Sequence, residues 1–355
     1  MSTLGFISDW LATLPPFGGA PPNIEIFTDG KSACLYRLEW GGGLALLKRY
    51  KATSSPARTG ADKRRAEAAA LTHFAQIGLA PELLWEGVMP GSMDDALIYR
   101  WAEGTRAADQ VLTNDQLELL AAALRTVHSD AHNPKLLSPA PRTLEGWWGH
   151  THELYRDMQM RLATEMPIEI SDTLSRLLQP VSGDVQAHKR FWQGAPLTLV
   201  HGRPEPANMI LSEDQVILKN WQDFGLGDPS YELAAASRLL AEQLGEEEPA
   251  RHFVDSYLDG TEDNMLARRV EIYRRVWPFG YLLSTIKSYL DQIHRLPVAP
   301  HEARSIAFHF RDLLTTYEWP GPTSDRVVAV LGEWLADKQE NTANGTDEQT
   351  AASRL

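Results

Sequence analysis

Apolar and polar residues alternate through most of the first fifty residues. Three segments show this pattern, "NIEIFTD" (23–29), "ACLYRLEW" (33–40) and "LALLKRY" (44–50). Alternation with a period of two turns one face of each segment toward a core, which is typical of β-strands. The pattern therefore predicts three consecutive strands, joined by turns at Asp29-Gly30 and Gly41–Gly43.

A helical pattern and two further strands complete the first hundred residues. Residues 51–63 form a polar loop, and the Ala-rich segment 64–78 has helical periodicity until Gly78 ends it. Segment 81–101 then alternates around Pro90-Gly91, which is typical of two strands joined by a turn. The predicted order is three strands, one helix and two strands.

Helical periodicity dominates from about residue 105 onward. The segment "TNDQLELLAAALRTVHS" (113–129) starts with a polar N-cap signal and continues with apolar residues at helical spacing. Further helices are expected at about 145–164, 169–188, 230–244 and 268–293. A hairpin interrupts them, in which "NMIL" and "VILK" flank the polar turn "SEDQ".

These elements predict an α+β protein of two lobes. We expect a small β-rich lobe at residues 1–101, a larger mainly helical lobe at 102–337 and a disordered polar tail at 338–355. A chain of 355 residues is long for a single hydrophobic core, and this length agrees with two lobes.

Charge and cysteine content narrow the classes of function. The formal net charge is −13 and the chain has no basic block, which argues against nucleic acid as a partner. Cys34 is the only cysteine, so an internal disulfide is excluded and a reducing, cytoplasmic location is expected. No segment approaches the roughly 20 consecutive apolar residues of a membrane span, so no membrane association is expected.

Residues 198–234, "TLVHGRPEPANMILSEDQVILKNWQDFGLGDPSYELA", carry the most specific pattern in the chain. This stretch resembles the aminoglycoside phosphotransferase and choline-kinase-like superfamily of small-molecule kinases. The superfamily pattern is His-Gly-Asp, Asn, Asp-Trp-Glu and Gly-Asp-Pro, with a further acid before Leu-Ala. The matching positions are His201, Gly202, Asn208, Trp221, Gly227, Asp228, Pro229, Glu232, Leu233 and Ala234. The resemblance extends over about residues 20–300 and implies a bilobal protein-kinase-like fold.

The resemblance also implies roles for individual side chains. Lys48 would reach the phosphates of ATP or another nucleotide, and Glu67 would pair with it. The alternative is that both are ordinary surface charges. His128 is expected to be structural, and Asp228 is expected to fix its loop and the start of the next helix.

Two backbone segments would complete this nucleotide site. The hinge segment consists of Arg100, Trp101 and Ala102, and the loop segment consists of Gly30, Lys31 and Ser32. The resemblance implies that the hinge backbone would bind an adenine edge and that the loop amides would contact phosphate. The alternative for the loop is a simple hairpin turn.

Two positions depart from the superfamily pattern. The resemblance places Arg203 where an acid would accept the proton of the acceptor hydroxyl, and Asn220 where an acid would bind Mg²⁺. A guanidinium cannot act as a base near neutral pH, and Mg²⁺ prefers carboxylates to neutral amides. We therefore expect weak or absent Mg²⁺ binding, and an anion site formed by Lys48, Arg203 and Asn208.

Two nearby acids are candidates to replace the missing base and the missing metal ligand. Asp223, in the triplet "DFG", is a candidate metal ligand beside Asn208 and Asn220, or else an exposed loop carboxylate. Glu205 is a candidate base, or else a salt-bridge partner of Arg203. Both acids leave open an active enzyme with non-standard residues.

Tryptophans are a second candidate binding feature. Trp147-Trp148, Trp192 and Trp277 could form a cage for a protonated or quaternary amine through cation–π contacts. The chain has eleven tryptophans, so packing in the core is the alternative for most of them.

The leading hypothesis is a degenerate phosphotransferase, or pseudokinase. It would bind a nucleotide, another phosphorylated small molecule or a protein partner and transfer phosphate poorly or not at all. One alternative is an active ATP-dependent small-molecule phosphotransferase that uses Asn208 with Asp223. Another is a protein-interaction module that binds no nucleotide. The pair Arg203 and Asn220 separates these hypotheses.

Overall fold

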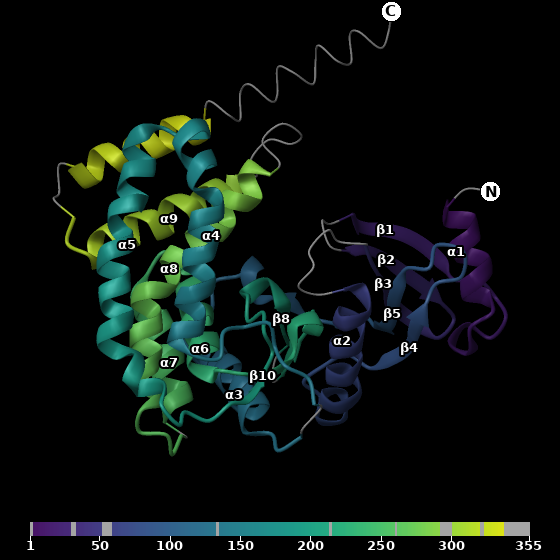
Figure 1. Cartoon of the computed structure of the whole chain (residues 1–355). Helices are drawn as coiled ribbons and strands as arrows, with labels where there is room; N and C mark the ends of the chain where they lie inside the picture. The colour runs from purple at the N-terminus through teal and green to yellow at the C-terminus, as the bar shows by residue number, and fades with distance from the viewer. Residues whose placement is uncertain are drawn as a thin grey trace, which may run out of the picture. The chain divides into compact units, whose positions relative to one another are not determined.

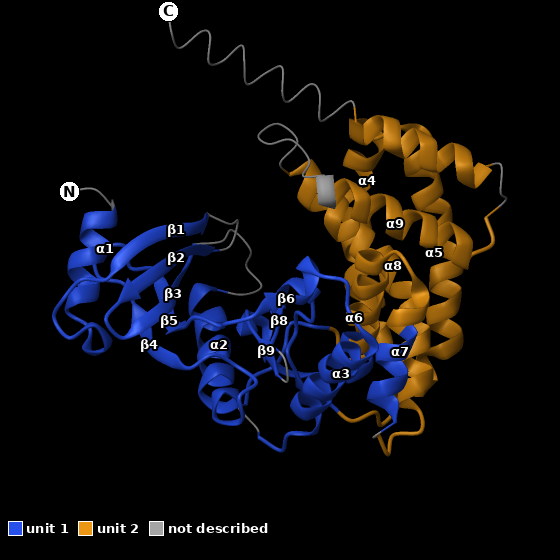
Figure 2. Cartoon of the chain, turned by 180° about the vertical axis from the view of Figure 1, so that it is seen from behind, with its two compact units in different colours: residues 1–140, 197–232, 251–260 blue, residues 141–196, 233–250, 261–355 orange. Residues whose placement is uncertain are grey.

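The computed structural model describes residues 3–29, 33–51, 59–132, 135–212, 215–259, 261–291, 300–319 and 323–336. The chain forms two compact units, each assembled from separate stretches (Figure 2). Unit 1 comprises residues 1–140, 197–232 and 251–260, and unit 2 comprises the remaining stretches, 141–196, 233–250 and 261–355. Nearly all of the motif at 198–234 therefore belongs to the same unit as the N-terminal strands. The lobe boundary expected at residue 101 stays a prediction.

The N-terminal part of unit 1 is a five-stranded antiparallel sheet (Figure 1). Its strands, in spatial order, are β1 (Asn23–Asp29), β2 (Ala33–Trp40), β3 (Gly43–Tyr50), β5 (Asp95–Arg100) and β4 (Leu83–Val88). All five strands were predicted from the alternation of apolar and polar residues, and all five are confirmed.

Helix α2 (Gly60–Phe74) connects β3 to β4, as predicted. It begins four residues earlier than expected, because the Thr59 hydroxyl accepts a hydrogen bond from the Asp62 amide and the Asp62 carboxylate accepts one from the Thr59 amide. Its last residue, Phe74, stacks on Trp221 with ring centroids 4.8 Å apart. This contact fixes the helix against the C-terminal half of the motif.

Helix α1 (Thr3–Ala12) was not predicted and corrects the expectation of a single helix in the first hundred residues. Its apolar face, with Ile7 and Leu11 fully buried, joins the core on one face of the sheet. In β3 that face carries Ala45 and Leu47. Because side chains alternate along a strand, Lys48 points to the opposite face, where Glu67 of α2 meets it.

The rest of unit 1 holds the motif on short strands and turns. Strands β6 (Thr105–Arg106), β8 (Met209–Leu211) and β9 (Val216–Leu218) form one small antiparallel sheet, in the order β6-β8-β9. Strand β7 (Thr198–Val200) pairs with β10 (Gly225–Gly227) in another. The predicted hairpin of β8 and β9 is confirmed. Residues 213 and 214 at its turn lie outside the described residues.

The remainder of the described chain is mainly helical, as predicted, although helices at 247–258, 300–316 and 323–336 were not individually predicted. The helices are α3 (Asn114–Ser129), α4 (Leu144–Glu165), α5 (Ile168–His188), α6 (Pro229–Leu244), α7 (Glu247–Leu258), α8 (Leu266–Leu290), α9 (Pro300–Thr316) and a segment at 323–336. None of the helices in the described ranges is long and apolar enough to cross a membrane. The antiparallel sheet followed by a mainly helical remainder confirms the α+β class. The tail at 338–355 lies outside the described residues.

Candidate functional site

A cavity of about 550 Å³ lies within unit 1, which is in the size range of small-molecule sites. Part of its lining is apolar and aromatic. These side chains come from the sheet, from the segment after β5 and from β8, and they include Phe27, Leu46, Tyr99, Trp101 and Ile210. The polar part of the lining contains the motif residues, so the cavity has an apolar part and a polar part.

The polar lining is strongly basic. Five basic side chains contact the cavity, namely Lys48, Arg100, Arg106, Arg203 and Lys219. Among the lining residues, all of them described, Asp109 is the single carboxylate, and it pairs with Arg106 at 2.6 Å. A protein with a net charge of −13 therefore has a positively charged cavity, which favours an anionic ligand.

Lys48 is held by a buried network on the sheet. Its Nζ donates to Glu67 Oε2 at 2.5 Å and to Asn220 Oδ1 at 2.7 Å. The Tyr50 hydroxyl donates to the same Glu67 oxygen at 2.5 Å. Burial lowers the pKa of Lys48, and the charge of Glu67 opposes this shift. Lys48 and Glu67 are thus a buried pair as predicted, and the alternative of surface charges is wrong.

Glu232 holds the His201-Gly202 turn in place. Its Oε2 accepts from the His201 amide at 2.9 Å, and its Oε1 accepts from the Gly202 amide at 2.6 Å. His128 lies 2.7 Å from Oε2 and 2.8 Å from the Tyr257 hydroxyl, which confirms its structural role. Burial raises the pKa of Glu232, but the hydrogen bond and charge of His128 outweigh it, and the net shift is downward.

Gly202 is required by a close approach of two loops. Its φ is +85°, and a Cβ atom at this position would lie 2.2 Å from the carbonyl oxygen of Asp223. No side chain fits there, because the contact is to backbone and the conformation is left-handed. The glycine therefore lets the 201–205 loop pack against the 221–224 turn.

His201 ties the two loops together through its neutral ring. Nδ1 accepts from the Arg203 amide at 3.2 Å, so Nε2 carries the proton and donates to the Lys219 carbonyl at 3.0 Å. Burial lowers the pKa of this imidazole. The ring therefore positions the backbone of both Arg203 and Lys219.

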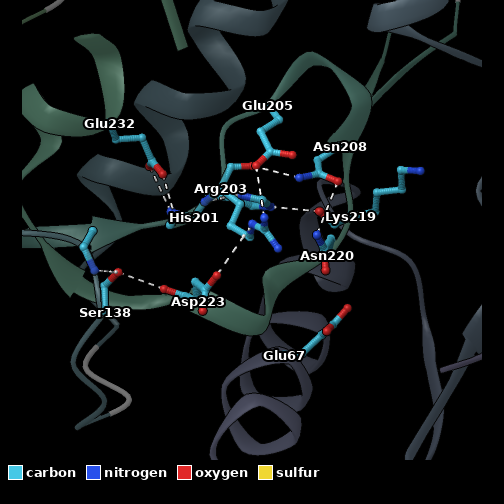
Figure 3. Close-up of polar contacts among 12 residues, drawn as sticks. Glu67, Ser138, His201, Arg203, Glu205, Asn208, Lys219, Asn220, Asp223 and Glu232 are labelled. Atoms are coloured by element: carbon cyan, nitrogen blue, oxygen red, sulfur yellow. Dashed lines mark hydrogen bonds and ion pairs between the residues drawn. The ribbon is translucent and has the colours of Figure 1, made fainter. Parts of the chain in front are cut away.

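Arg203, at the position predicted for a catalytic base, faces two carboxylates (Figure 3). Its guanidinium lies 3.3 Å from Glu205 Oε1 and 3.7 Å from Asp223 Oδ2. Of the two roles considered for Glu205, a base or a salt-bridge partner of Arg203, the structure shows the salt bridge. Asp223 is not an exposed loop carboxylate, because its side chain is 19% exposed and faces Arg203, and its carbonyl accepts from Ser138. The Asp223 carboxylate is therefore in ion-pair contact with an arginine of the protein.

Asn208 and Asn220 lie side by side next to Arg203. The Asn208 amide group donates to the Arg203 carbonyl at 3.1 Å, and a longer contact of 3.5 Å joins it to Asn220. Asn220 has a left-handed backbone (φ 66°), which asparagine tolerates better than most residues. Its side-chain oxygen accepts from Lys48.

These oxygens do not fit Mg²⁺ well. The candidate ligands are two neutral amides, one of them engaged by Lys48, and a carboxylate that faces an arginine. Mg²⁺ prefers carboxylates in octahedral geometry and retains several waters. Within the described ranges, no group of three or more His, Cys, Asp or Glu residues is arranged to hold a metal ion.

The predicted hinge residues all line the cavity. The Arg100 side chain is tied to Glu82 at 3.1 Å and the Trp101 amide donates to the Leu44 carbonyl. The Trp101 ring packs edge-on against Phe27 at 5.3 Å. The Ala102 amide has no hydrogen-bond partner in the described part of the chain and is available to a ligand. Gly30, Lys31 and Ser32 lie outside the described residues.

Sequence reasoning missed Lys219 and Arg106 as cavity residues. Lys219 directly follows the apolar triplet of β9 and directly precedes Asn220. Its place next to a candidate site residue could have identified it as a cavity residue from the sequence. Burial lowers the pKa of Lys219, and the charge of Arg106 lowers it further. Arg106 gave no signal, because its place in the cavity depends on the pairing of β6 with β8.

The tryptophans proposed as an amine cage lie in unit 2. Trp147 and Trp192 are buried against Tyr273, at 6.4 and 5.1 Å between ring centroids. Trp277 is buried too and stacks on Tyr281 at 4.6 Å. These contacts favour the alternative of core packing for the three buried rings.

The fold is that of small-molecule kinases. The chain is similar to a choline kinase from Cryptosporidium parvum, with 12% identity and a TM-score of 0.64 over 94% of this chain and 99% of the other. It is similar to a choline/ethanolamine kinase family protein from Mesorhizobium loti, with 18% identity and a TM-score of 0.58 over 94% and 100%. A spectinomycin phosphotransferase solved with ADP and spectinomycin has 11% identity and a TM-score of 0.57 over 92% and 98%.

The predicted bilobal kinase-like fold is thereby confirmed. The model of the phosphotransferase enzyme family matches residues 23–269, which is more than half of the chain. The chain therefore belongs to the phosphotransferase enzyme family. A search of curated proteins found no significant match.

Proposed function

We propose that this protein binds a nucleotide in the cavity of unit 1 and transfers its phosphoryl group slowly or not at all. One observation carries the proposal: protein cations engage the oxygens at the catalytic and metal positions. Lys48 binds the side-chain oxygen of Asn220, and Arg203 faces Asp223. The site therefore carries positive charge that suits an anionic ligand.

The charge change explains why transfer would be slow. Phosphoryl transfer depends on positioning and on compensation of charge by metal ions, and a general base contributes about 10²–10⁴ in rate. Two unit charges about 4 Å apart interact by roughly 4 kcal/mol at an effective dielectric of 20. A positive Arg203 in place of an acid therefore opposes Mg²⁺ and attracts phosphate.

The apolar part of the cavity suits a nucleobase. Trp101 and Phe27 offer aromatic surface, and the Ala102 amide, which has no hydrogen-bond partner among the described residues, offers a donor at the hinge. The spectinomycin phosphotransferase of this fold was solved with ADP, which supports a nucleotide as the ligand. We place the protein in the cytoplasm, where its single buried thiol, Cys34, stays reduced.

A thermal-shift and turnover experiment tests the proposal. We expect ATP and ADP to stabilise the protein in EDTA, and we expect little ATP consumption with or without Mg²⁺. The double variant Arg203→Asp with Asn220→Asp should gain stabilisation by ATP that depends on Mg²⁺. The matched control is Arg326→Asp with Asn264→Asp, which makes the same charge change at two exposed residues outside the cavity and should not gain it.

Other outcomes would point to different functions. ATP binding that requires Mg²⁺, or fast turnover that Asp223→Ala abolishes, would contradict the proposal and identify an active phosphotransferase. If no nucleotide shifts the melting temperature under any condition, a protein-interaction module becomes the better hypothesis.

A further inference from the structure

Lys219 differs from the other basic residues of the cavity in having no partner. Four of the five basic side chains lie within 3.3 Å of a carboxylate. The partners are Glu67 for Lys48, Glu82 for Arg100, Asp109 for Arg106 and Glu205 for Arg203. In the part of the chain that the structure describes, the Lys219 ammonium has neither an ion pair nor a hydrogen bond.

The backbone of Lys219 is fixed from both sides. Its amide donates to the Asn208 carbonyl at 2.9 Å, and its carbonyl accepts from His201 Nε2 at 3.0 Å. In Figure 3 its side chain extends away from Asn208 and Asn220. The protein thus holds the backbone of Lys219 in a fixed place on the cavity wall, while the ammonium group makes no ion pair or hydrogen bond with any described residue and feels the charge of Asp109 only at longer range.

An unbalanced, partly buried charge indicates a ligand of opposite sign. Removing an ion from water costs free energy unless a counter-ion replaces the water. Burial lowers the pKa of Lys219, the charges of Arg106 and Lys48, which line the same cavity, lower it further, and the charge of Asp109 opposes them, so a bound anion would relieve the remaining repulsion. Phosphate oxygens are suitable partners, because ammonium groups bind them as compact point charges.

The position of Lys219 indicates which form of the ligand binds. It is the residue next to Asn220, the candidate metal position, whose oxygen accepts from Lys48. We infer that the Lys219 ammonium supplies, from the cavity wall beside Asn220, positive charge for the phosphates that a metal would otherwise provide, and that the cavity selects a nucleoside polyphosphate without bound Mg²⁺. This inference rests on the proposed function. A Mg²⁺-bound polyphosphate carries two fewer negative charges and would bring its cation close to Lys48, Arg203 and Lys219.

Isothermal titration calorimetry with ADP and ATP tests this inference. For the wild-type chain we expect dissociation constants at least tenfold lower in EDTA than in excess Mg²⁺. We expect Lys219→Met to weaken metal-free binding by tenfold or more and to reduce the difference between the two conditions. Lys219→Arg should keep most of the affinity. The matched control is Lys189→Met, at an exposed lysine outside the cavity, which should bind like the wild type.

Each outcome is informative. If the wild type binds no nucleotide in either condition, both the proposed function and this inference fail. If nucleotide binds but Mg²⁺ strengthens binding, or Lys219→Met binds as the wild type does, this inference fails while nucleotide binding stands. The comparison of EDTA with Mg²⁺ uses the wild-type chain, so it decides the question even if a variant does not fold.

Discussion

Two walls of the cavity differ in how their charges are balanced. On the sheet wall, formed by β3 and β5, the Lys48 side chain is only 4% exposed and is matched by Glu67 at 2.5 Å. On the loop wall, formed by residues 203–208 and 219–223, Arg203 is 36% exposed and its carboxylate contacts are 3.3 and 3.7 Å long. Lys219, on the same wall, has no ion pair with any described residue.

This difference in charge balance predicts different roles for the two walls. A fully buried charge has to be balanced inside the protein, or the fold loses stability. Surplus charge at the edge of a cavity is available to a ligand. The sheet wall should therefore contribute mainly to stability, and the loop wall mainly to binding.

The largest expected effect tests the sheet wall. Lys48→Met leaves the Glu67 carboxylate buried with Tyr50 and without its cation, and should lower the free energy of unfolding by about 3–5 kcal/mol. Lys219→Met is the matched variant on the loop wall. It removes a partly buried charge with no ion-pair partner among the described residues, so the free energy of unfolding should be unchanged or raised by about 0.5 kcal/mol. Urea unfolding without ligand measures both.

If Lys48→Met and Lys219→Met lower the free energy of unfolding by the same amount, the distinction between the two walls is wrong. That result would mean that Lys219 is balanced in the folded protein as Lys48 is, and that its charge belongs to the fold. A loss confined to Lys48→Met supports the distinction.

A smaller effect is expected where the loop wall depends on backbone conformation. Gly202→Ala places a methyl group against the Asp223 carbonyl in a left-handed backbone, and should cost about 3 kcal/mol of stability. Gly149→Ala, inside helix α4 with no atom near the added methyl group, should instead stabilise by about 0.5–1 kcal/mol. If Gly202→Ala leaves the free energy of unfolding unchanged, the close approach of the two loops does not require glycine at this position.

Much of the fold could be predicted from sequence, because its signals are local. Alternation predicted the five strands, and caps and periodicity predicted the long helices. The Lys48–Glu67 pair followed from the family pattern. Helix α1 was missed because its apolar face is short and is completed by the sheet it packs on. The early start of α2 was missed because its cap lies in a stretch that reads as a polar loop.

The charge balance of the site could not be predicted, because it is a tertiary property. Lys219 belongs to the cavity with Arg106, which is more than a hundred residues away in the chain, and its lack of a partner is visible only in three dimensions. The same holds for Asp223, which the sequence suggests is either a metal ligand or an exposed acid. Its contact with Arg203 crosses twenty residues and two turns.

The smallest effect is a pH dependence that comes from His201, which holds the loop wall through Arg203 and Lys219. Burial lowers the pKa of His201 below its ordinary value of 6.5, so the unfolded chain binds more protons than the folded chain as the pH falls through that value. The free energy of unfolding should therefore decrease between pH 7.5 and pH 5. One such group contributes at most about 1.4 kcal/mol per pH unit.

Removing the ring isolates this contribution. His201→Gln should give a flatter stability profile over the same pH range, while His150→Gln, at an exposed helix position, should keep the slope of the wild type. A slope unchanged in His201→Gln would assign the effect to another group. Protonation of Nδ1 would break the hydrogen bond from the Arg203 amide, and the ring would then hold the 203 loop less firmly. The affinity of the wild type for ADP in EDTA should therefore weaken in the pH range in which its stability declines.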